Sequence, residues 1–355
     1  MTNESSKYKE RLSAAITWLR FPLIFLIIML HCYSVQRLEG DHETYFKVVY
    51  PFALWLGETG VPGFFFISGY LYFLSKKSYR KKIGDRVYTL LIPYLLWNLL
   101  LLLLYLIIWA FGHPLVIFKT SIADYGWVDF LRAFWDRGVF NYGNSAPLLC
   151  PLWYIRNLLI MSILSPIIYY IVRYAREFFL IAVAAWWMTT NNNAFTPQTI
   201  LFFSLGGYFS IFDINPLKMV SDKKFLFLTL ALSFAIADIF VHVAYGTHFN
   251  LIIHRMALLL NIPALLLLAD YMDRYHHHKL TRFLSQSAFI VFCIHYPIVL
   301  ILRKICVIFF AGASDAIHIP LYFLCVILTT LMSLSFYWAL NKYCPKAKSI
   351  LSGNR

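Results

Sequence analysis

The sequence has little charge, few acidic residues and no cysteine pattern. Only 14% of its 355 residues are charged, with 17 acidic against 31 basic ones. A soluble domain usually carries about a quarter charged residues. The six cysteines include no C-x-x-C pair, so they give no sign of a redox site. The composition therefore excludes an ordinary soluble enzyme.

The sequence also lacks an internal repeat and a signal-peptidase site. Many secondary transporters consist of two related halves, so the missing repeat argues mildly against that class. Lysines precede the first apolar run, as in a signal peptide. The run is too long for one, however, and no A-x-A site follows it, so we expect a retained first helix. We expect one membrane-embedded domain over residues 1–355.

Long apolar runs are abundant instead. Hydrophobic residues make up 60% of the chain and aromatic ones 19%. A helix needs about twenty apolar residues to cross a bilayer core about 30 Å thick. The expected fold is therefore an all-α polytopic membrane protein of about ten transmembrane helices. The segments are 13–36, 48–74, 87–111, 152–172, 178–190, 197–213, 224–245, 249–271, 284–308 and 318–340.

The basic residues gather on one side of this topology, six of them between residues 76 and 86. Lys and Arg favour the cytoplasmic side of a membrane protein. We therefore expect a multi-pass protein of the plasma (inner) membrane with both termini in the cytoplasm. The net charge of +14 then reflects topology, and a nucleic-acid partner is not expected. The other side carries only Arg37, Lys47, Lys119, Arg132 and Arg137.

The longest connection, residues 112–151, lies on the expected outer side. Within it "YGWVDFLRAFW" places its aromatic and aliphatic side chains at helical spacing, which predicts a short amphipathic helix on the membrane surface. Two roles remain open for this loop. It is either an interfacial anchor or a lid and sugar-stacking platform over an outward-facing site.

Several ionisable or amide side chains fall within the apolar segments. The ionisable ones cost about 2.5–3.5 kcal/mol each on insertion scales, so they usually face a cavity or a partner. Each also has a structural interpretation: an arginine can extend to headgroups, and a histidine or carboxylate can bond across helices. The set comprises Arg20, His31, Glu58, Asn98, Arg156, Asn157, Asp238, His242, His254, Arg255 and His295.

Arg20 and His31 are related by helix geometry. Eleven residues at about 100° each make three turns plus about 20°, so both side chains leave one face, about 16 Å apart along the axis. Pro22 frees a backbone carbonyl on the preceding turn, which is tolerated where helices line a cavity. One cleft could hold both groups.

The chain resembles the acyltransferase-3 family of integral membrane acyltransferases, which includes O-acetyltransferases of surface glycans. That family's first helix carries an Arg and a His separated by ten residues, as Arg20 and His31 are. The resemblance spans nearly the whole chain. Further matches, in order, are "GVPGFFFISGYL" (60–71), "LLIPYLLWN" (90–98), "PLWYIRNLL" (151–159), "FFSLGGYFS" (202–210) and "SAFIVFCIHYP" (287–297).

The resemblance implies transfer of an acyl group, most commonly acetyl, from cytoplasmic acyl-CoA to a hydroxyl of a cell-surface or lipid-linked glycan. We expect no metal, because the three adjacent histidines at 276–278 are typical of a solvated turn and make a poor metal site. A neutral imidazole suits removal of the hydroxyl proton, so we expect His31 to be the general base. We expect Glu58 to orient His31, and Arg20 to meet a phosphate or thioester oxygen of the donor.

Other residues are expected to bind the substrates. Lys81, Lys82 and Arg86 form a basic rim that would favour the CoA phosphates. Many family members carry a second arginine three residues after the first, but this chain has Thr89 there, and Gly63 replaces a larger apolar residue. Oxyanion donors are expected at Arg156 or Asn157. The expected acceptor-binding set is Trp153, Arg156, Asn157, Arg255 and His295.

Two other functions compete with acyl transfer. A transporter or flippase of a lipid-linked sugar would use the buried charges as a relay. A membrane sensor or scaffold would use no chemistry at all. Stabilisation of the protein by CoA or acetyl-CoA would separate an enzyme from a flippase. The acyl group and the acceptor are left open by the sequence.

Overall fold

The structure is a computed structural model that describes residues 3–33, 42–112, 116–117, 120–136, 145–190, 195–245, 248–273 and 278–354. Its first elements are α1 (Asn3–Tyr33), α2 (Glu43–Tyr50), η1 (Pro51–Leu56), η2 (Gly57–Thr59), α3 (Gly60–Leu74), α4 (Tyr79–Arg86), η3 (Val87–Leu91), α5 (Ile92–Ala110), β1 (Val116–Ile117), β2 (Thr120–Ser121), η4 (Ile122–Asp124) and α6 (Trp127–Ala133). The chain continues through η5 (Cys150–Leu152), α7 (Trp153–Ile163), α8 (Ser165–Thr189), α9 (Phe195–Ile211), α10 (Pro216–Asp222), α11 (Lys224–Tyr245), α12 (His248–Asp273), α13 (His278–Phe310), α14 (Asp315–Tyr343) and α15 (Pro345–Ser352).

The all-α prediction is confirmed. Helices fill nearly all of the described ranges, and the two-residue strands β1 and β2 pair in a small antiparallel hairpin. Within those ranges six helices are long and apolar enough to cross a membrane, or up to eight if each of two bent pairs is one span. Each of the ten predicted segments coincides with one or more helices over most of its described length, and residues 34–36 of the first lie outside the described residues.

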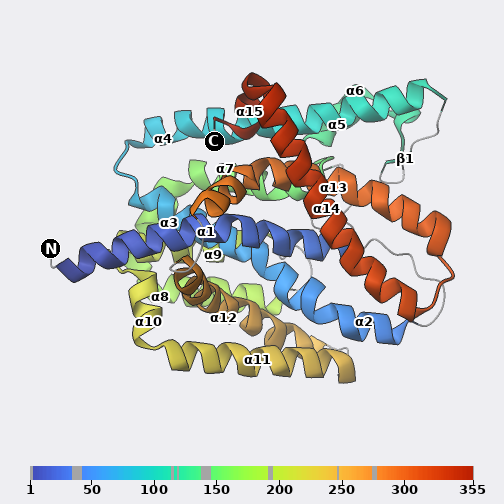
Figure 1. Ribbon diagram of the computed structural model, residues 1–355. Coiled ribbons are helices and arrows are strands. Elements are labelled where there is room, and N and C mark those ends of the chain that lie inside the picture. Colours follow the sequence, from blue (N-terminus) through green and yellow to red (C-terminus); the bar gives the residue numbers. More distant parts are fainter. Residues whose placement is uncertain are drawn as a thin grey trace.

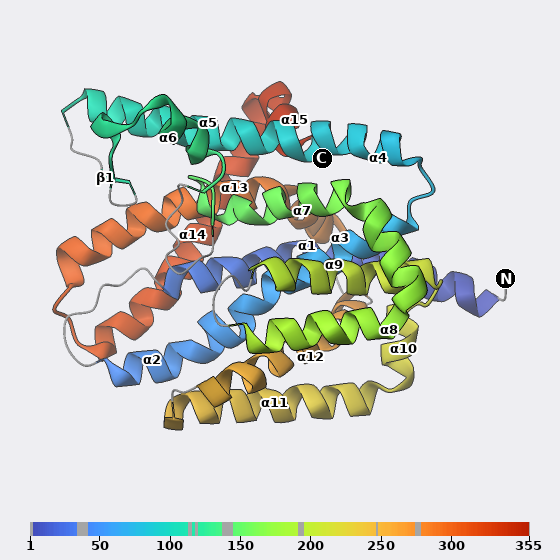
Figure 2. The same ribbon diagram turned by 180° about the vertical axis from the view of Figure 1, so that it is seen from behind.

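The fourth predicted segment, 152–172, is wrong as a single straight helix. α7 ends at Ile163 and α8 begins at Ser165, and the two are bent by 70°. Pro166 explains the break, because proline lacks the N–H that would continue α7 and fits the first turn of a new helix. A second turn at Arg176, with φ 48° and ψ −127°, divides α8 itself. The later half of α8 then runs beside α9 (Figure 2).

The second predicted segment is a helical run built from α2, η1, η2 and α3. η1 is a π-helix that starts at Pro51, and η2 is a 3₁₀ turn that starts at Gly57. Pro51 has no backbone N–H to donate within a regular helix. Such π-helical turns are frequent at functional sites. The irregular stretch carries Glu58.

α1 lies in the middle of the bundle (Figure 1). It packs against α3, α12, α13 and α14, so apolar side chains are buried all around it. The buried set on α1 includes Leu19, Leu23, Ile24, Ile27 and Ile28. The helix that carries Arg20 and His31 is thus surrounded by protein rather than by lipid.

α3 and α9 approach each other through glycines from two of the family motifs. A Cβ placed on Gly69 would lie 2.0 Å from the Phe203 carbonyl oxygen, and one on Gly206 would lie 2.0 Å from the Phe66 carbonyl oxygen. These neighbours are backbone atoms, which cannot rotate away. The motifs "GVPGFFFISGYL" and "FFSLGGYFS" therefore pack on each other, and only glycine permits the contact.

We expect Gly69→Ala to lower the free energy of unfolding by about 1–3 kcal/mol, the usual cost of overpacking. Thermal unfolding of the detergent-purified protein measures this change. Gly84→Ala is the matched control, because nothing lies within 4 Å of its Cβ position. That control should be neutral or stabilising by up to about 1 kcal/mol. Equal stability of the two variants would contradict the close packing of α3 and α9.

Candidate active site

An open cleft of about 700 Å³ lies beside Arg20. One wall is a single face of α1, and the other is the first turns of α13 with Asp273 at the end of α12. Arg20 on α1 and Arg282 on α13 line its opposite walls. The carboxylates of Glu10 and Asp273 also line it. The lining residues are Glu10, Ser13, Ala14, Thr17, Arg20, Asp273, Thr281, Arg282, Ser285 and Gln286.

The wall of this cleft on α12 is held by an ion pair. Asp270 receives two hydrogen bonds from the Arg11 guanidinium, from Nε at 2.8 Å and from Nη2 at 2.6 Å. Arg11 also lies over the ring of Tyr8, 4.6 Å from its centroid. A bidentate arginine–carboxylate pair is stronger and more directional than a single contact. The pair thus fixes the start of α1 against the end of α12.

His31 lies further along the line of contact between α1 and α13, which we call the seam. The cleft at Arg20 lies at one end of it. Its ring is 5.3 Å from that of His295 and 5.2 Å from that of Tyr296, between ring centroids. Both neighbours come from α13, the helix that also lines the cleft at Arg20. The structure therefore places Arg20 and His31 toward the same partner helix, which agrees with the shared face that their spacing predicted.

The sequence of α13 shapes this part of the seam. Pro297 cannot donate a backbone hydrogen bond to the carbonyl of residue 293, which loosens the helix next to His295. The Nδ1 of His295 is hydrogen-bonded to backbone carbonyls of the preceding turn, 2.7 Å from the Phe292 oxygen and 3.3 Å from the Val291 oxygen. The short η5, which carries the buried Cys150, packs against α13.

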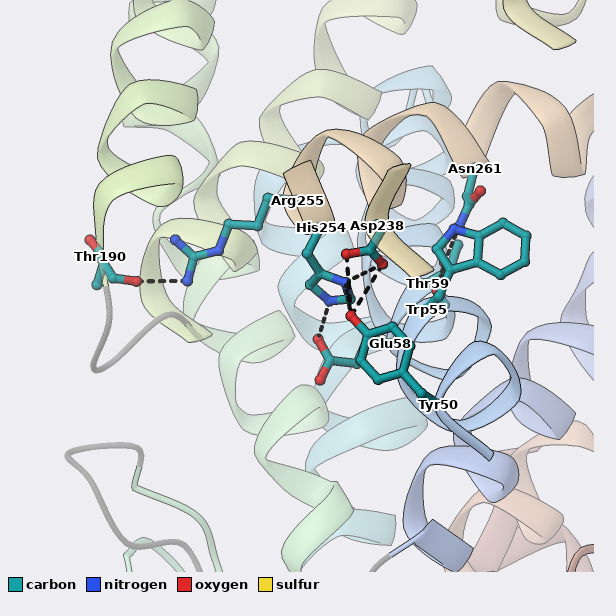
Figure 3. A network of polar contacts seen from close by, with 9 residues as sticks. All are labelled: Tyr50, Trp55, Glu58, Thr59, Thr190, Asp238, His254, Arg255 and Asn261. Atoms are coloured by element: carbon teal, nitrogen blue, oxygen red, sulfur yellow. Dashed lines mark hydrogen bonds and ion pairs between the residues drawn. The ribbon is translucent and has the colours of Figure 1, made fainter. Parts of the chain in front are cut away.

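Glu58 is not where we expected it to act. Its Oε2 lies 3.1 Å from Nε2 of His254, and Nδ1 of His254 lies 2.9 Å from Oδ2 of Asp238. Figure 3 shows the imidazole between the two carboxylates. Tyr50 donates its hydroxyl to Asp238 at 3.2 Å. The pairing of Glu58 with His31 is corrected: Glu58 reaches toward α11 and α12, whereas His31 reaches toward α13.

This network grows more exposed along its length. The side chain of Asp238 is 0% exposed, that of His254 is 13% and that of Glu58 is 41%. His242 stacks on Tyr50 with ring centroids 3.5 Å apart. An imidazole that carries both protons can donate to two carboxylates at once. The network therefore joins η2, α11 and α12 by ion pairs and adds α2 by a hydrogen bond.

Arg156 and Asn157 are engaged by the protein itself. Arg156 donates to the carbonyls of Trp135 at 2.5 Å and Ser145 at 2.9 Å, and to Asn157 Oδ1 at 3.2 Å. Asn157 in turn donates to Thr199 at 3.1 Å. These bonds hold the 112–151 connection on α7 and α9. Their expected role as oxyanion donors stays a prediction, with most of their donors already used.

The predicted short helix of that connection is present as α6. Trp127 and Leu131 of α6 are exposed, as is Trp135 just after it, while Phe130 and Phe134 pack inward. Leu148 donates its N–H to the Ala133 carbonyl at 2.7 Å, which holds the helix on the bundle. Parts of the connection, at 113–115, 118–119 and 137–144, lie outside the described residues.

Two other predicted acceptor-binding residues take part in packing. Arg255 donates to the carbonyls of Trp187 and Thr190, where α8 ends, and Figure 3 shows the Thr190 bond. Cationic side chains satisfy the last carbonyls of a helix in this way. Trp153 stacks on Phe195, with ring centroids 3.8 Å apart. Neither side chain shares the seam with His31.

Comparison with known proteins identifies the chain. A family model described as "Acyltransferase domain" matches residues 13–338. The chain belongs to the acyltransferase-3 family. It is also 25% identical over 321 residues to the succinoglycan biosynthesis protein ExoH of Rhizobium meliloti (strain 1021), covering 85% of this chain and 82% of that protein. No solved structure matches it.

The basic rim of Lys81, Lys82 and Arg86, expected to bind the donor of an acyltransferase-3 enzyme, precedes α5. Lys82 donates to the Tyr72 carbonyl at 2.9 Å, and Arg86 lies over the Tyr72 ring, 5.5 Å from its centroid. Lys81 is exposed. None of the three lines the cleft at Arg20. Their binding of CoA phosphates stays a prediction.

The position where many acyltransferase-3 members carry a second arginine is a packing site here. The Thr89 hydroxyl donates to the Asp85 carbonyl at 2.8 Å. The backbone of Thr89 also meets Gly353, where a Cβ would lie 2.5 Å from the Thr89 oxygen. Arg282 instead contributes a second arginine to the cleft. The polar pairs 281–282 and 285–286, four residues apart on α13, were the sequence signal for that wall.

Proposed function

We propose that this acyltransferase moves an acyl group, acetyl first, from acyl-CoA to a hydroxyl of a cell-surface or lipid-linked glycan. The observation that carries the proposal is one seam between α1 and α13 with two ends. Arg20 lines an open polar cleft at one end, and His31 meets His295 and Tyr296 further along. The donor would bind at the first end and react near the second.

The cleft suits a charged, extended donor. Its volume of about 700 Å³ lies within the usual range for ligand and cofactor sites. Arg20 and Arg282 supply planar donors that match phosphate oxygens. Glu10 and Asp273 also line it, and we assign them to the adenine and pantetheine amides and hydroxyls rather than to phosphate. The positive-inside pattern would place this end in the cytoplasm.

His31 would serve as the general base. It takes the proton of the acceptor hydroxyl, whose oxygen forms a bond to the thioester carbonyl carbon. The carbon–sulfur bond then breaks, and the departing CoA thiolate accepts that proton from His31. Proton transfer of this kind contributes about 10²- to 10⁴-fold in rate. The relative named for succinoglycan biosynthesis supports a surface glycan as the acceptor class.

Ligand-dependent stability tests the donor site. In detergent, CoA or acetyl-CoA at 100 times its Kd should stabilise the protein by about 2.7 kcal/mol and raise its Tm. Adenosine, which lacks the phosphates and the pantetheine arm, is the matched control and should have little effect. An unchanged Tm with both CoA compounds would count against acyl-CoA and in favour of a flippase.

A further inference from the structure

His295 carries a buried ring nitrogen that has no hydrogen-bond partner among the described residues. The side chain is 0% exposed, and its Nε2 makes no hydrogen bond to the part of the chain that the structure describes. The large majority of buried side-chain polar atoms in proteins are hydrogen-bonded. An orphaned nitrogen beside the candidate base therefore calls for an explanation in terms of function.

The other nitrogen of His295 determines what Nε2 can do. Nδ1 lies 2.7 Å from the Phe292 carbonyl oxygen, and a carbonyl only accepts. Nδ1 must therefore carry the proton. In the neutral ring Nε2 then carries the lone pair and is a hydrogen-bond acceptor. The bond from Nδ1 to the backbone of its own helix fixes this tautomer of the ring.

His31 is the imidazole next to this acceptor. The two ring centroids are 5.3 Å apart and the ring planes differ by 38°. Ring nitrogens lie outside the centroids, so rotation of the His31 ring can bring an N–H of His31 onto Nε2 of His295. Tyr296 meets the His31 ring edge-on from another side, at 74°. The pair thus needs only a side-chain rotation to form a bond.

A general base of this type needs a second group that accepts its other N–H, because that bond fixes which nitrogen presents its lone pair. Glu58 is engaged by His254 instead. We infer that His295 fills this place, accepting an N–H from His31 and holding the His31 lone pair toward the acceptor hydroxyl. His295 is then a positioning residue. This inference rests on the proposed function of His31.

A neutral acceptor has a chemical consequence that a carboxylate would not have. It orients His31 without adding a negative charge that would hold the proton on the ring. After the hydroxyl oxygen has bonded to the thioester carbon, the proton on His31 passes to the CoA sulfur as the carbon–sulfur bond breaks. Orientation and proton return are therefore compatible in one pair of imidazoles.

Amide substitutions separate the two nitrogens of His295. The amide of His295→Gln reaches the place of Nε2, so its oxygen can still accept from His31. The amide of His295→Asn reaches only the place of Nδ1, so it keeps the bond to Phe292 and loses the acceptor. Each variant is assayed in membrane vesicles with acyl-labelled acetyl-CoA and the endogenous glycan, at varied acetyl-CoA concentration.

We expect His295→Asn to lower kcat at least 30-fold with the KM for acetyl-CoA within twofold, and His295→Gln to keep at least a tenth of kcat. A Tm shift with CoA confirms that each variant is folded. If His295→Asn does not accumulate, His295→Leu, which also lacks the acceptor, takes its place with the same expected loss. Equal losses in the Asn and Gln variants, a change confined to KM, or full activity of His295→Asn would overturn the inference. Failure of the unsubstituted protein to transfer label would overturn the proposed function as well. The experiment therefore distinguishes failure of the proposed function from failure of the inference about His295.

Discussion

Replacing His31 with alanine is expected to lower acyl transfer by about 10²- to 10⁴-fold, the usual contribution of a general base. The acceptor alcohol is a poor nucleophile until its proton is removed, and the alanine variant has no group to remove it. The acyl content of the surface glycan, measured by mass spectrometry of cells that carry each variant, reports the loss.

Two controls accompany this experiment. The amount of protein in the membrane should be unchanged, because the half-buried His31 side chain meets His295 and Tyr296 of α13 through ring contacts, which alanine loses without burying a new polar group. His318→Gln replaces a buried histidine in the first turn of α14, beside His42. It should leave glycan acylation intact. Normal acylation in the His31 variant would remove His31 from the mechanism.

Replacing Arg20 with alanine is expected to raise the KM for acetyl-CoA by about 10- to 150-fold. A hydrogen bond to a charged group contributes about 1.5–3 kcal/mol, and every 1.4 kcal/mol corresponds to a factor of ten. The side chain is exposed into the cleft, so its loss should not disturb packing. Initial rates in vesicles at varied acetyl-CoA concentration measure the change.

Ser13→Ala is the matched control for Arg20, because Ser13 lines the same wall of the cleft without charge. Its KM should stay within about twofold. Arg20→Lys keeps the charge but not the planar fork, so it should fall between the alanine variant and the native protein. An Arg20→Ala variant with an unchanged KM and an unchanged Tm shift with CoA would place the donor elsewhere.

Helix periodicity predicted the face shared by Arg20 and His31, because that face depends on one helix alone. Eleven residues of α1 bring Arg20 and His31 to one face whatever surrounds it. The structure adds which helix that face meets, and the answer is α13, which follows in the sequence more than 240 residues later. The segment lengths likewise follow from bilayer thickness, which is why the helices themselves were predicted.

Contacts across helices were harder to predict. Glu58, His254 and Asp238 lie on three different helices, and nothing in their spacing indicates that they meet. The partners of Arg156 and Arg255 are backbone carbonyls, which every residue possesses, so composition gives no sign of them. Charged residues in apolar segments therefore include both members of the proposed site and residues that support helix ends.

The central claim is that an acyl group passes from acyl-CoA to a glycan hydroxyl along the seam between Arg20 and His31. Membrane vesicles supplied with acetyl-CoA labelled in its acetyl group test it most directly, by recovery of the label in the extracted glycan. The account predicts labelled glycan from vesicles with the native protein and background label with His31→Ala. Equal labelling with and without the protein, or label that stays on CoA, would contradict it.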